Sequence, residues 1–210
     1  MPWIVLGITI SYIIGSVPTA YILGRVLKGI DIRQFGSGNV GATNVLRVLG
    51  KTAALFVLVL DMLKGVACVI FVAEALAGKI ASLDLQTLRL IFGISGICGH
   101  NWTVFLNFKG GKGVATTFGV MFALAIKISP LRLIFAILVL AWLIIFFATR
   151  IVSLASIVTA ILLPICMGAF KQPGVFIGAG TLIAASIVLR HKSNLQRLFQ
   201  GKEQRVKFKG

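Results

Sequence analysis

Residues 52–78, TAALFVLVLDMLKGVACVIFVAEALAG, decide the fold class because they are almost entirely apolar over more than one membrane thickness. A helix needs about 20 apolar residues to cross the hydrocarbon core of a bilayer. Two charged residues, Asp61 and Lys64, interrupt the middle of this stretch. They share a helix face at this spacing, and charges inside a membrane usually pair or serve a function. We therefore expect a membrane helix that carries either an ion pair or part of a functional site.

The whole chain has the composition of an integral membrane protein. Apolar residues make up 58% of its 210 residues and charged residues 12%, against about 45–50% and about 25% in soluble domains. The mean hydropathy is +1.02. We predict an all-α, polytopic helical membrane protein with a single domain, residues 1–210. Its seven expected transmembrane segments are 3–24, 52–78, 85–108, 114–126 (short or broken), 131–149, 151–170 and 174–190. The first is too long for a signal-peptide core, so we expect it to be retained.

The excess of positive charge points to anionic lipids and anionic substrates. The chain has 21 Lys and Arg against 5 Asp and Glu, a formal net charge of +16. No basic stripe or aromatic platform lies outside the apolar segments, so we expect no nucleic-acid partner. If the N-terminus faces outside and all seven segments cross, most cations face the cytoplasm, as the positive-inside rule requires. The exceptions are Lys64 within a span and, on the outer side, Lys79, Arg89, Lys127, Arg132 and Lys171.

Three polar segments interrupt the apolar sequence, and all three fall on the cytoplasmic side in this orientation. We call them the first motif (residues 36–47), the second motif (residues 99–113) and the third motif (residues 191–201). Each combines small residues with amides, hydroxyls or fixed cations, and such groups bind anions together with uncovered backbone N–H groups. The three segments predict one shared site for a phosphate-bearing molecule.

The first motif is built around glycines that permit turns with positive φ and close backbone approach, namely Gly36, Gly38 and Gly41. Between and after them stand neutral hydrogen-bond donors and a forked cation suited to phosphate. These are Ser37, Asn39, Thr43, Asn44 and Arg47. The alternative interpretation is an interfacial glycine-rich turn that caps a helix.

The second motif contains the glycine loop KGGKG, residues 109–113, which opens onto an expected helix from Val114. Helix N-termini attract anions. The loop is not a Walker A motif, because Leu106 and Gly113 stand where that motif needs Gly and then Ser or Thr. The alternatives are a glycine hinge with cationic anchors and, for His100, a packed role in the core.

The third motif places His191, Asn194 and Arg197 at intervals of three residues, which puts them on one face of a helix. The alternative is a solvated basic tail after the last span. Glu203 follows shortly after, and we expect it to form a salt bridge with a nearby cation rather than to act in catalysis.

Motifs of several other enzymes are missing. Phe105 and Gln196 stand where a His-x4-Asp dyad would need Asp, which excludes the usual glycerolipid acyltransferase dyad. There is no Gly-x-Ser-x-Gly segment, no acidic cluster suited to Mg²⁺, and no short metal-ligand spacing among the three cysteines. We expect no metal and no cofactor, and a carboxylate general base is hard to identify.

Together the three motifs resemble those of the bacterial acyl-phosphate-dependent glycerol-3-phosphate acyltransferases, the PlsY family. The matching segments are GSGNVGATN at 36–44 with Arg47, GHNW at 99–102 with FKGGKGVAT at 108–116, and HxxNxxRL at 191–198 with Gly201 and Glu203. The resemblance covers essentially the whole chain and implies seven membrane helices. It also implies transfer of a fatty acyl chain from acyl phosphate to the sn-1 hydroxyl of sn-glycerol 3-phosphate. The implied products are lysophosphatidic acid and phosphate, made at the cytoplasmic face of the bacterial inner membrane.

The resemblance implies that five residues are essential or contact substrate: Ser37, Arg47, Lys112, His191 and Asn194. We expect the last four to hold the acyl-phosphate head, with Ser37 and Thr43 as hydroxyl donors and the glycine loop seating glycerol 3-phosphate. The further predicted substrate contacts are Gly38, Asn39, Thr43, Asn44, His100, Lys109, Gly110, Gly111 and Gly113. The expected partners are acyl phosphate, glycerol 3-phosphate, membrane lipids and other enzymes of phospholipid synthesis.

The group that removes the hydroxyl proton is left open by the sequence. The donor's own phosphate, His191 as a general base, and an acyl-enzyme on Ser37 are three alternatives. An anion transporter is the competing function, because broken helices and intramembrane charges occur in transporters, but no inverted repeat is visible. A lipid-phosphate phosphatase would need Arg- and His-rich motifs that this chain lacks.

Overall fold

The computed structural model describes residues 1–206, and within this range every regular element is a helix. The chain forms two compact units, residues 1–127 and 128–210, which we describe separately. Unit 1 contains α1 (Pro2–Ser16), α2 (Thr19–Lys28), η1 (Ile32–Gln34), α3 (Ala42–Val48), α4 (Lys51–Ala67), η2 (Cys68–Val72), α5 (Ala73–Ala77), α6 (Leu85–Asn101), η3 (Val104–Leu106) and α7 (Val114–Lys127). Unit 2 contains α8 (Leu131–Thr149), α9 (Val152–Ala169), α10 (Gly174–Arg190) and α11 (Lys192–Phe199). The single domain stays a prediction.

The stretch that decides the fold class forms one continuous helical rod, as predicted. α4, η2 and α5 follow one another without a break, and together they give an apolar helix of 27 residues, Lys51–Ala77. η2 is a short π-helical stretch toward the C-terminal end of the rod, where one extra residue is accommodated in the turn. The rod is long enough to cross a bilayer with some tilt.

The first apolar segment is broken, which the sequence analysis did not predict. α1 ends at Ser16 and α2 begins at Thr19. Pro18 has no N–H to donate and disfavours helical backbone at the preceding residue, and Val17 is accordingly extended with ψ 115°. The break therefore lies in the first segment, whereas α7, the predicted short or broken one, is short but continuous with 14 residues.

Side chains from elsewhere in unit 1 satisfy the carbonyl groups that this break leaves without helical partners. Thr103 Oγ1 donates to the Ser16 carbonyl, and Lys64 Nζ donates to the Val17 carbonyl at 2.6 Å. A backbone break at membrane depth is tolerated only where protein groups or water satisfy the freed groups. The break is thus coupled to α4 and to the second motif.

The count of seven membrane crossings is not confirmed, although helices occur in all seven predicted places. Among the described residues, four helices or helix pairs are long and apolar enough to span, and the bent pair α10 and α11 makes up to five. α6 and α7, with 17 and 14 residues, fall below that length. The expected third segment was too long, because α6 ends at Asn101 and Asn107 and Phe108 adopt left-handed backbone.

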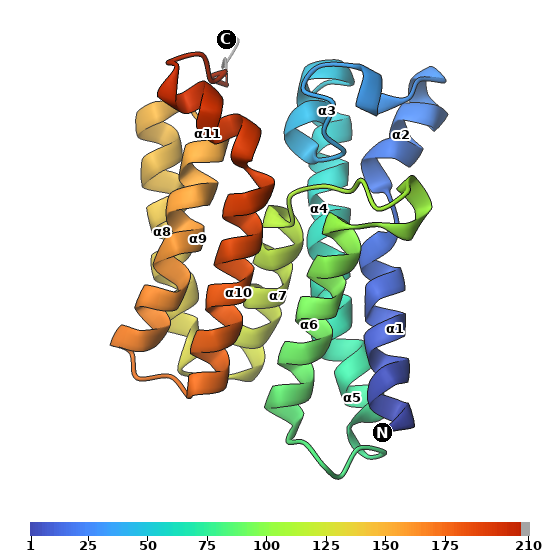
Figure 1. Ribbon diagram of the computed structural model, residues 1–210, viewed down its shortest axis with the longest axis vertical. Helices are drawn as coiled ribbons and strands as arrows, with labels where there is room; N and C mark the ends of the chain where they lie inside the picture. Colours follow the sequence, from blue (N-terminus) through green and yellow to red (C-terminus); the bar gives the residue numbers. More distant parts are fainter. Residues whose placement is uncertain (207–210) are drawn as a thin grey trace. The chain divides into compact units, whose positions relative to one another are not determined.

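Small residues bring the long helices of unit 1 into close contact, and Figure 1 shows α1, α4 and α6 running alongside one another. A side chain at Gly15 would collide with the backbone of Gly96 on α6. A side chain at Gly119 on α7 would likewise collide with the Met62 carbonyl on α4. Close backbone approach of this kind is typical of helices that pack inside membranes.

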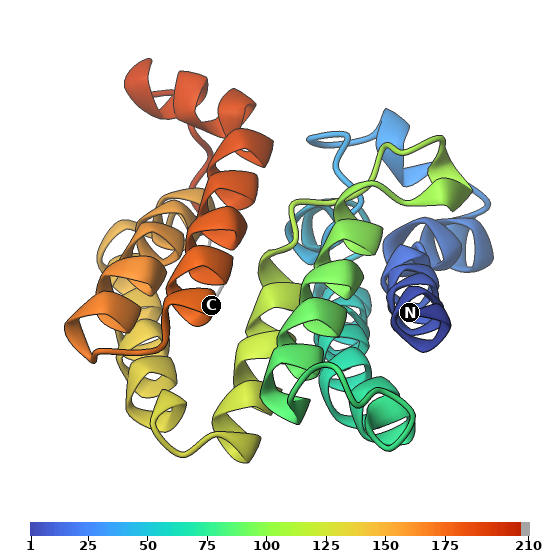
Figure 2. The same ribbon diagram turned by 60° about the horizontal axis from the view of Figure 1, so that its bottom comes forward.

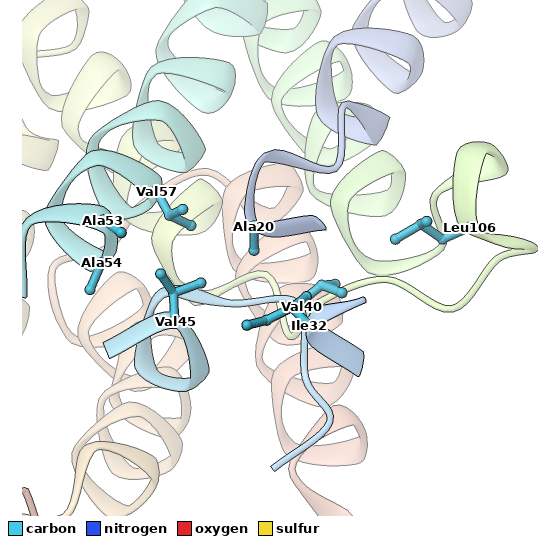
Figure 3. Packing of buried hydrophobic residues seen from close by; sticks show 8 residues of the cluster. All are labelled: Ala20, Ile32, Val40, Val45, Ala53, Ala54, Val57 and Leu106. Atoms are coloured by element: carbon cyan, nitrogen blue, oxygen red, sulfur yellow. The ribbon is translucent and has the colours of Figure 1, made fainter. Parts of the chain in front are cut away.

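A hydrophobic cluster fixes the first motif to the second motif at one end of unit 1. Its members come from α2, η1, the first motif, α4 and η3, and Figure 3 shows them facing a common centre. They are Ala20, Ile32, Val40, Val45, Ala53, Ala54, Val57 and Leu106. Because Val40 belongs to the first motif and Leu106 to the second, burial of this cluster holds the two loops together.

Unit 2 is a packed set of three long helices with a short terminal one. α8 packs on α9, where the Trp142 indole donates to the Ser156 hydroxyl at 3.2 Å, and α9 packs on α10. α11 turns away from α10 by 62°, and Figure 2 shows this bend at the red end of the chain. The bend falls at His191, the first residue of the third motif.

Candidate functional site

Asn44 holds the first motif in shape from within. Its amide nitrogen donates to the carbonyls of Ile32 and Phe35, and its amide oxygen accepts from the Ser37 N–H at 2.7 Å. The side chain is 1% exposed. Gly36 adopts φ 62° directly against this amide, where a side chain would collide with Asn44 Oδ1. Asn44 therefore organises the backbone of the loop, and its predicted contact with substrate stays a prediction.

The groups that the first motif presents outward are the hydroxyl of Ser37 and the guanidinium of Arg47. Ser37 and Gly38 are exposed in the loop that Asn44 braces. Thr43 lies in the first turn of α3 and Arg47, also exposed, in its last turn. An exposed hydroxyl and a fixed cation on a braced scaffold are groups that can bind a phosphate.

The glycine loop of the second motif folds back onto the end of α6. The Gly111 N–H donates to the His100 carbonyl at 2.9 Å, and the Gly110 N–H donates to the Asn101 carbonyl at 3.2 Å. Any side chain at position 111 would overlap the Nε2 edge of the His100 imidazole. The loop then leads directly into α7, whose first turn is closed by the Thr117 N–H and the Gly113 carbonyl. Lys109 is exposed and Lys112 is half-buried.

The intramembrane charges form the expected ion pair. Lys64 Nζ contacts Asp61 Oδ1 at 2.5 Å, and Thr19 Oγ1 donates to the same carboxylate oxygen at 2.6 Å. Asp61 is 1% exposed and Lys64 7% exposed. Both charges are thus compensated inside the protein, as burial requires.

All five side-chain carboxylates lie among the described residues and accept hydrogen bonds there. Asp31 is bonded by Arg33, Asp61 by Thr19 and Lys64, Glu74 by Arg89, Asp84 by Thr87, and Glu203 by Asn194 and Arg197. The hydrogen bond from Arg33 holds the pKa of Asp31 at about 2 against the opposing effect of its burial. Asp31, directly before the first motif, therefore stays ionised and engaged at neutral pH, which makes it a poor general base.

In unit 2, Glu203 forms the expected salt bridge to a nearby cation and thereby holds the third motif. Arg197 Nε donates to Glu203 Oε2 at 2.6 Å, and the Asn194 amide and the Ser153 hydroxyl both donate to Oε1. Asn194 was predicted to contact substrate, but nothing in the sequence indicates its hydrogen bond to Glu203. Glu203 thus connects α9 and α11 and fixes the orientation of the Asn194 amide.

His191 lies at the junction of α10 and α11 and is buried. Its Nδ1 lies 2.8 Å from the Ile187 carbonyl. A carbonyl only accepts hydrogen bonds, so the ring carries its proton on Nδ1 and leaves Nε2 for other partners. This tautomer is the one that a general base acting through Nε2 would need.

The structure joins the loops of the first and second motifs through the hydrophobic cluster at one end of unit 1, and the shared role of their predicted site residues stays a prediction. The predicted residues of the third motif lie together in unit 2. The convergence of all three motifs on one phosphate stays a prediction. Sequence reasoning missed Thr103 and Thr19, whose roles depend on a helix break that apolar periodicity does not reveal.

Comparisons with known proteins agree over the whole chain. The model of a family described as glycerol-3-phosphate acyltransferase matches residues 5–201. A glycerol-3-phosphate acyltransferase of Chlorobium phaeobacteroides (strain BS1) is 41% identical, with 97% of this chain and 96% of the relative covered. Glycerol-3-phosphate acyltransferase 2 of Moorella thermoacetica is 42% identical, with 96% of each chain covered.

Solved structures agree as well. The crystal structure of PlsY, an integral membrane glycerol 3-phosphate acyltransferase, in its glycerol 3-phosphate form is 35% identical and has a TM-score of 0.84. The match covers 97% of this chain and 96% of that one. The lysophosphatidic acid form of PlsY gives a TM-score of 0.81 at the same identity, with 97% of this chain and 95% of that one covered.

Replacing Glu203 by Gln should destabilise unit 2 in a pH-dependent way. Burial alone would raise the pKa of the Glu203 carboxyl, but the hydrogen bonds from Asn194, Ser153 and Arg197 outweigh burial and lower the pKa. Since the folded pKa lies below the unfolded value of about 4.3, the stabilisation is complete above that pH and is lost as the pH falls through the folded pKa. Thermal unfolding in detergent at pH 7 should show E203Q weakened by about 1–3 kcal/mol.

The control is K202Q, which removes a charge from the exposed neighbouring side chain without touching the Glu203 carboxylate. The difference in melting temperature between wild type and E203Q should shrink below about pH 4. A difference that stayed constant from pH 7 to pH 3 would contradict this assignment.

Proposed function

Because the chain belongs to the glycerol-3-phosphate acyltransferase family, we propose that it transfers a fatty acyl group from acyl phosphate to the sn-1 hydroxyl of sn-glycerol 3-phosphate. The products are lysophosphatidic acid and inorganic phosphate, and the reaction serves phospholipid synthesis. The observation that carries the proposal is the joining of the first and second motifs at one end of unit 1. There the exposed Ser37 and Arg47 accompany a glycine loop that leads into a helix N-terminus. The family assignment argues against the transporter alternative.

The chemistry requires little covalent help from the protein. The sn-1 oxygen of glycerol 3-phosphate attacks the acyl carbonyl carbon, and a new ester C–O bond forms. The bond between that carbon and the bridging phosphate oxygen breaks, and phosphate leaves with the electron pair. Acyl phosphate is a mixed anhydride with a good leaving group, so positioning and charge stabilisation can supply most of the rate enhancement.

Different groups of the site bind the two substrates. Arg47 and Lys112 stabilise the charge on the acyl-phosphate head, and Ser37 and Thr43 supply neutral hydroxyl donors. The glycine loop uses the N–H groups of Gly110 and Gly111 on carbonyls at the end of α6 and offers the start of α7 to the phosphate of glycerol 3-phosphate. The participation of His191 and Asn194 in binding the acyl-phosphate head stays a prediction from the sequence.

The proton of the attacking hydroxyl leaves by one of three routes. The leaving phosphate takes it directly, His191 takes it on Nε2, or Ser37 first forms an acyl-enzyme. The hydrogen bonds that all five carboxylates already accept disfavour a carboxylate base, and we favour the leaving phosphate. His191 has the tautomer that the second route would need.

We place the protein in the bacterial cytoplasmic membrane, with the N-terminus outside and the active site at the cytoplasmic face. The support is the distribution of Lys and Arg, since most of them fall on the side of the three motifs under this orientation. The other enzymes of phospholipid synthesis are proposed partners in the same membrane.

The donor is tested with a panel of acyl phosphate, acyl-CoA and acyl carrier protein carrying the same chain. Purified protein should form lysophosphatidic acid from acyl phosphate and glycerol 3-phosphate, and phosphate release should depend on glycerol 3-phosphate. R47K should lower kcat/KM by about tenfold or more, because Lys cannot reproduce a forked contact with phosphate. Turnover of acyl-CoA at the rate of acyl phosphate would contradict the proposed donor.

The proton route is tested by single-turnover reactions quenched in acid. We expect no acyl ester on Ser37, and H191Q should retain a substantial part of the wild-type kcat, since the leaving phosphate takes the proton. A trapped serine ester would establish the acyl-enzyme route instead. A loss of kcat by about 10² or more in H191Q, with KM unchanged, would establish the imidazole base.

The orientation is tested by labelling single cysteines in membrane vesicles with an impermeant thiol reagent. S193C in α11 and S82C between α5 and α6 both place the thiol at an exposed position. S193C should react only from the cytoplasmic side and S82C only from the outer side. The native cysteines are buried or half-buried, and a variant without them is the background control. Reaction of S193C from outside would overturn the proposed orientation.

A further inference from the structure

The buried ion pair of Asp61 and Lys64 has no part in the reaction as described above. The two residues are 1% and 7% exposed inside a membrane helix, where an ion pair costs more than apolar packing unless it is well bonded. A small cavity of about 10 Å³, enough for one water, borders both residues together with Ser16, Thr19 and His100.

The pair is bonded to the break in the first span. Lys64 Nζ donates to the Val17 carbonyl and reaches the Thr19 hydroxyl at 3.3 Å, while Thr19 donates to Asp61. Lys64 and Thr19 together therefore hold the start of α2.

The pair also lies close to the second motif, because the His100 imidazole stands next to Asp61. His100 Nδ1 lies 3.8 Å from Asp61 Oδ1, too far for a direct hydrogen bond but close enough for an electrostatic contact. The opposite edge of the same ring, at Nε2, packs against Gly111. The His100 carbonyl in turn receives the Gly111 N–H. The ring thus stands between the buried carboxylate and the glycine loop.

We propose that Asp61 is a positioning residue that orients His100 against the glycine loop and thereby sets the affinity for glycerol 3-phosphate. Asp61 does not touch the substrate. It fixes the ring, and the ring supports the backbone of Gly111, which leads directly to the N–H groups at the start of α7 that bind the phosphate. The inference rests on the proposed function in that the glycine loop seats glycerol 3-phosphate.

A purely structural ion pair would behave differently in kinetics. It would change how much protein folds and how stable it is, while the folded fraction would bind substrate normally. A positioning role changes the KM for one substrate more than for the other. Small displacements at a binding site reduce activity by about 10- to 100-fold, which is measurable in KM.

The experiment uses the full chain in lipid nanodiscs and compares D61N with wild type. D61N keeps the size and the acceptor for Thr19 but removes the charge. The KM for glycerol 3-phosphate should rise about tenfold or more, while the KM for acyl phosphate should stay within about twofold. E74Q is the matched control, since Glu74 pairs with Arg89 and Lys127 in the same unit. It should leave both KM values unchanged.

Because D61N leaves Lys64 as an uncompensated buried charge, the neutral double variant D61N/K64Q provides a second test if D61N does not fold. A cycle of D61N, H100Q and D61N/H100Q then asks whether Asp61 acts through the ring. If it does, the double variant should be no worse than H100Q alone, because the two changes remove the same support.

A KM for glycerol 3-phosphate within about twofold of wild type in folded D61N or D61N/K64Q would overturn the proposal, as would strictly additive effects in the cycle. The proposed function is tested separately by the wild type. If wild-type protein made no lysophosphatidic acid, calorimetric titration of glycerol 3-phosphate into D61N and wild type would still test the positioning role, with weaker binding by D61N supporting it and equal binding refuting it.

Discussion

The structure of unit 1 depends on the carbonyl groups that the break at Pro18 releases inside an apolar helix. In a membrane such groups must be satisfied within the protein. Lys64 donates to that of Val17 and Thr103 to that of Ser16. Lys64 belongs to α4 and Thr103 to the second motif, so these two hydrogen bonds link α1, α4 and the loop after α6.

Buried side chains also hold the loops around the candidate site through hydrogen bonds. Asn44 uses its whole amide on backbone groups of the first motif, and Glu203 uses both carboxylate oxygens on the third. These side chains carry no exposed chemistry, yet they determine how Ser37, Arg47 and Asn194 are presented. Loops rich in glycine have little intrinsic preference for one conformation, and buried hydrogen bonds supply the missing rigidity.

Sequence reasoning reached the helical membrane class, the places of the helices and the Asp61–Lys64 pair, because apolar length and i, i+3 spacing are local signals. It missed the break in the first segment, although Pro18 was visible, because the short segment GSVPT at 15–19 is flanked by apolar residues on both sides. It extended α6 to residue 108, since Val104, Phe105 and Leu106 look like a continuing span. The chain directly after that helix is held by a non-local contact, a hydrogen bond from Thr103 to the Ser16 carbonyl. The sequence does not show whether an amide such as Asn44 contacts a ligand or a backbone carbonyl.

The length of α1 bears on how unit 1 meets its bilayer. Its 15 residues make a helix of about 22 Å, about 8 Å shorter than a typical hydrocarbon core. A helix that starts at the far boundary therefore ends below the near one, and α2 completes the 27-residue span Pro2–Lys28. The junction of the two helices then lies within the depth of the hydrocarbon tails. A molecule with a long hydrocarbon tail can bring its polar end to this junction without rising out of the lipid. The depth of the junction therefore depends on bilayer thickness.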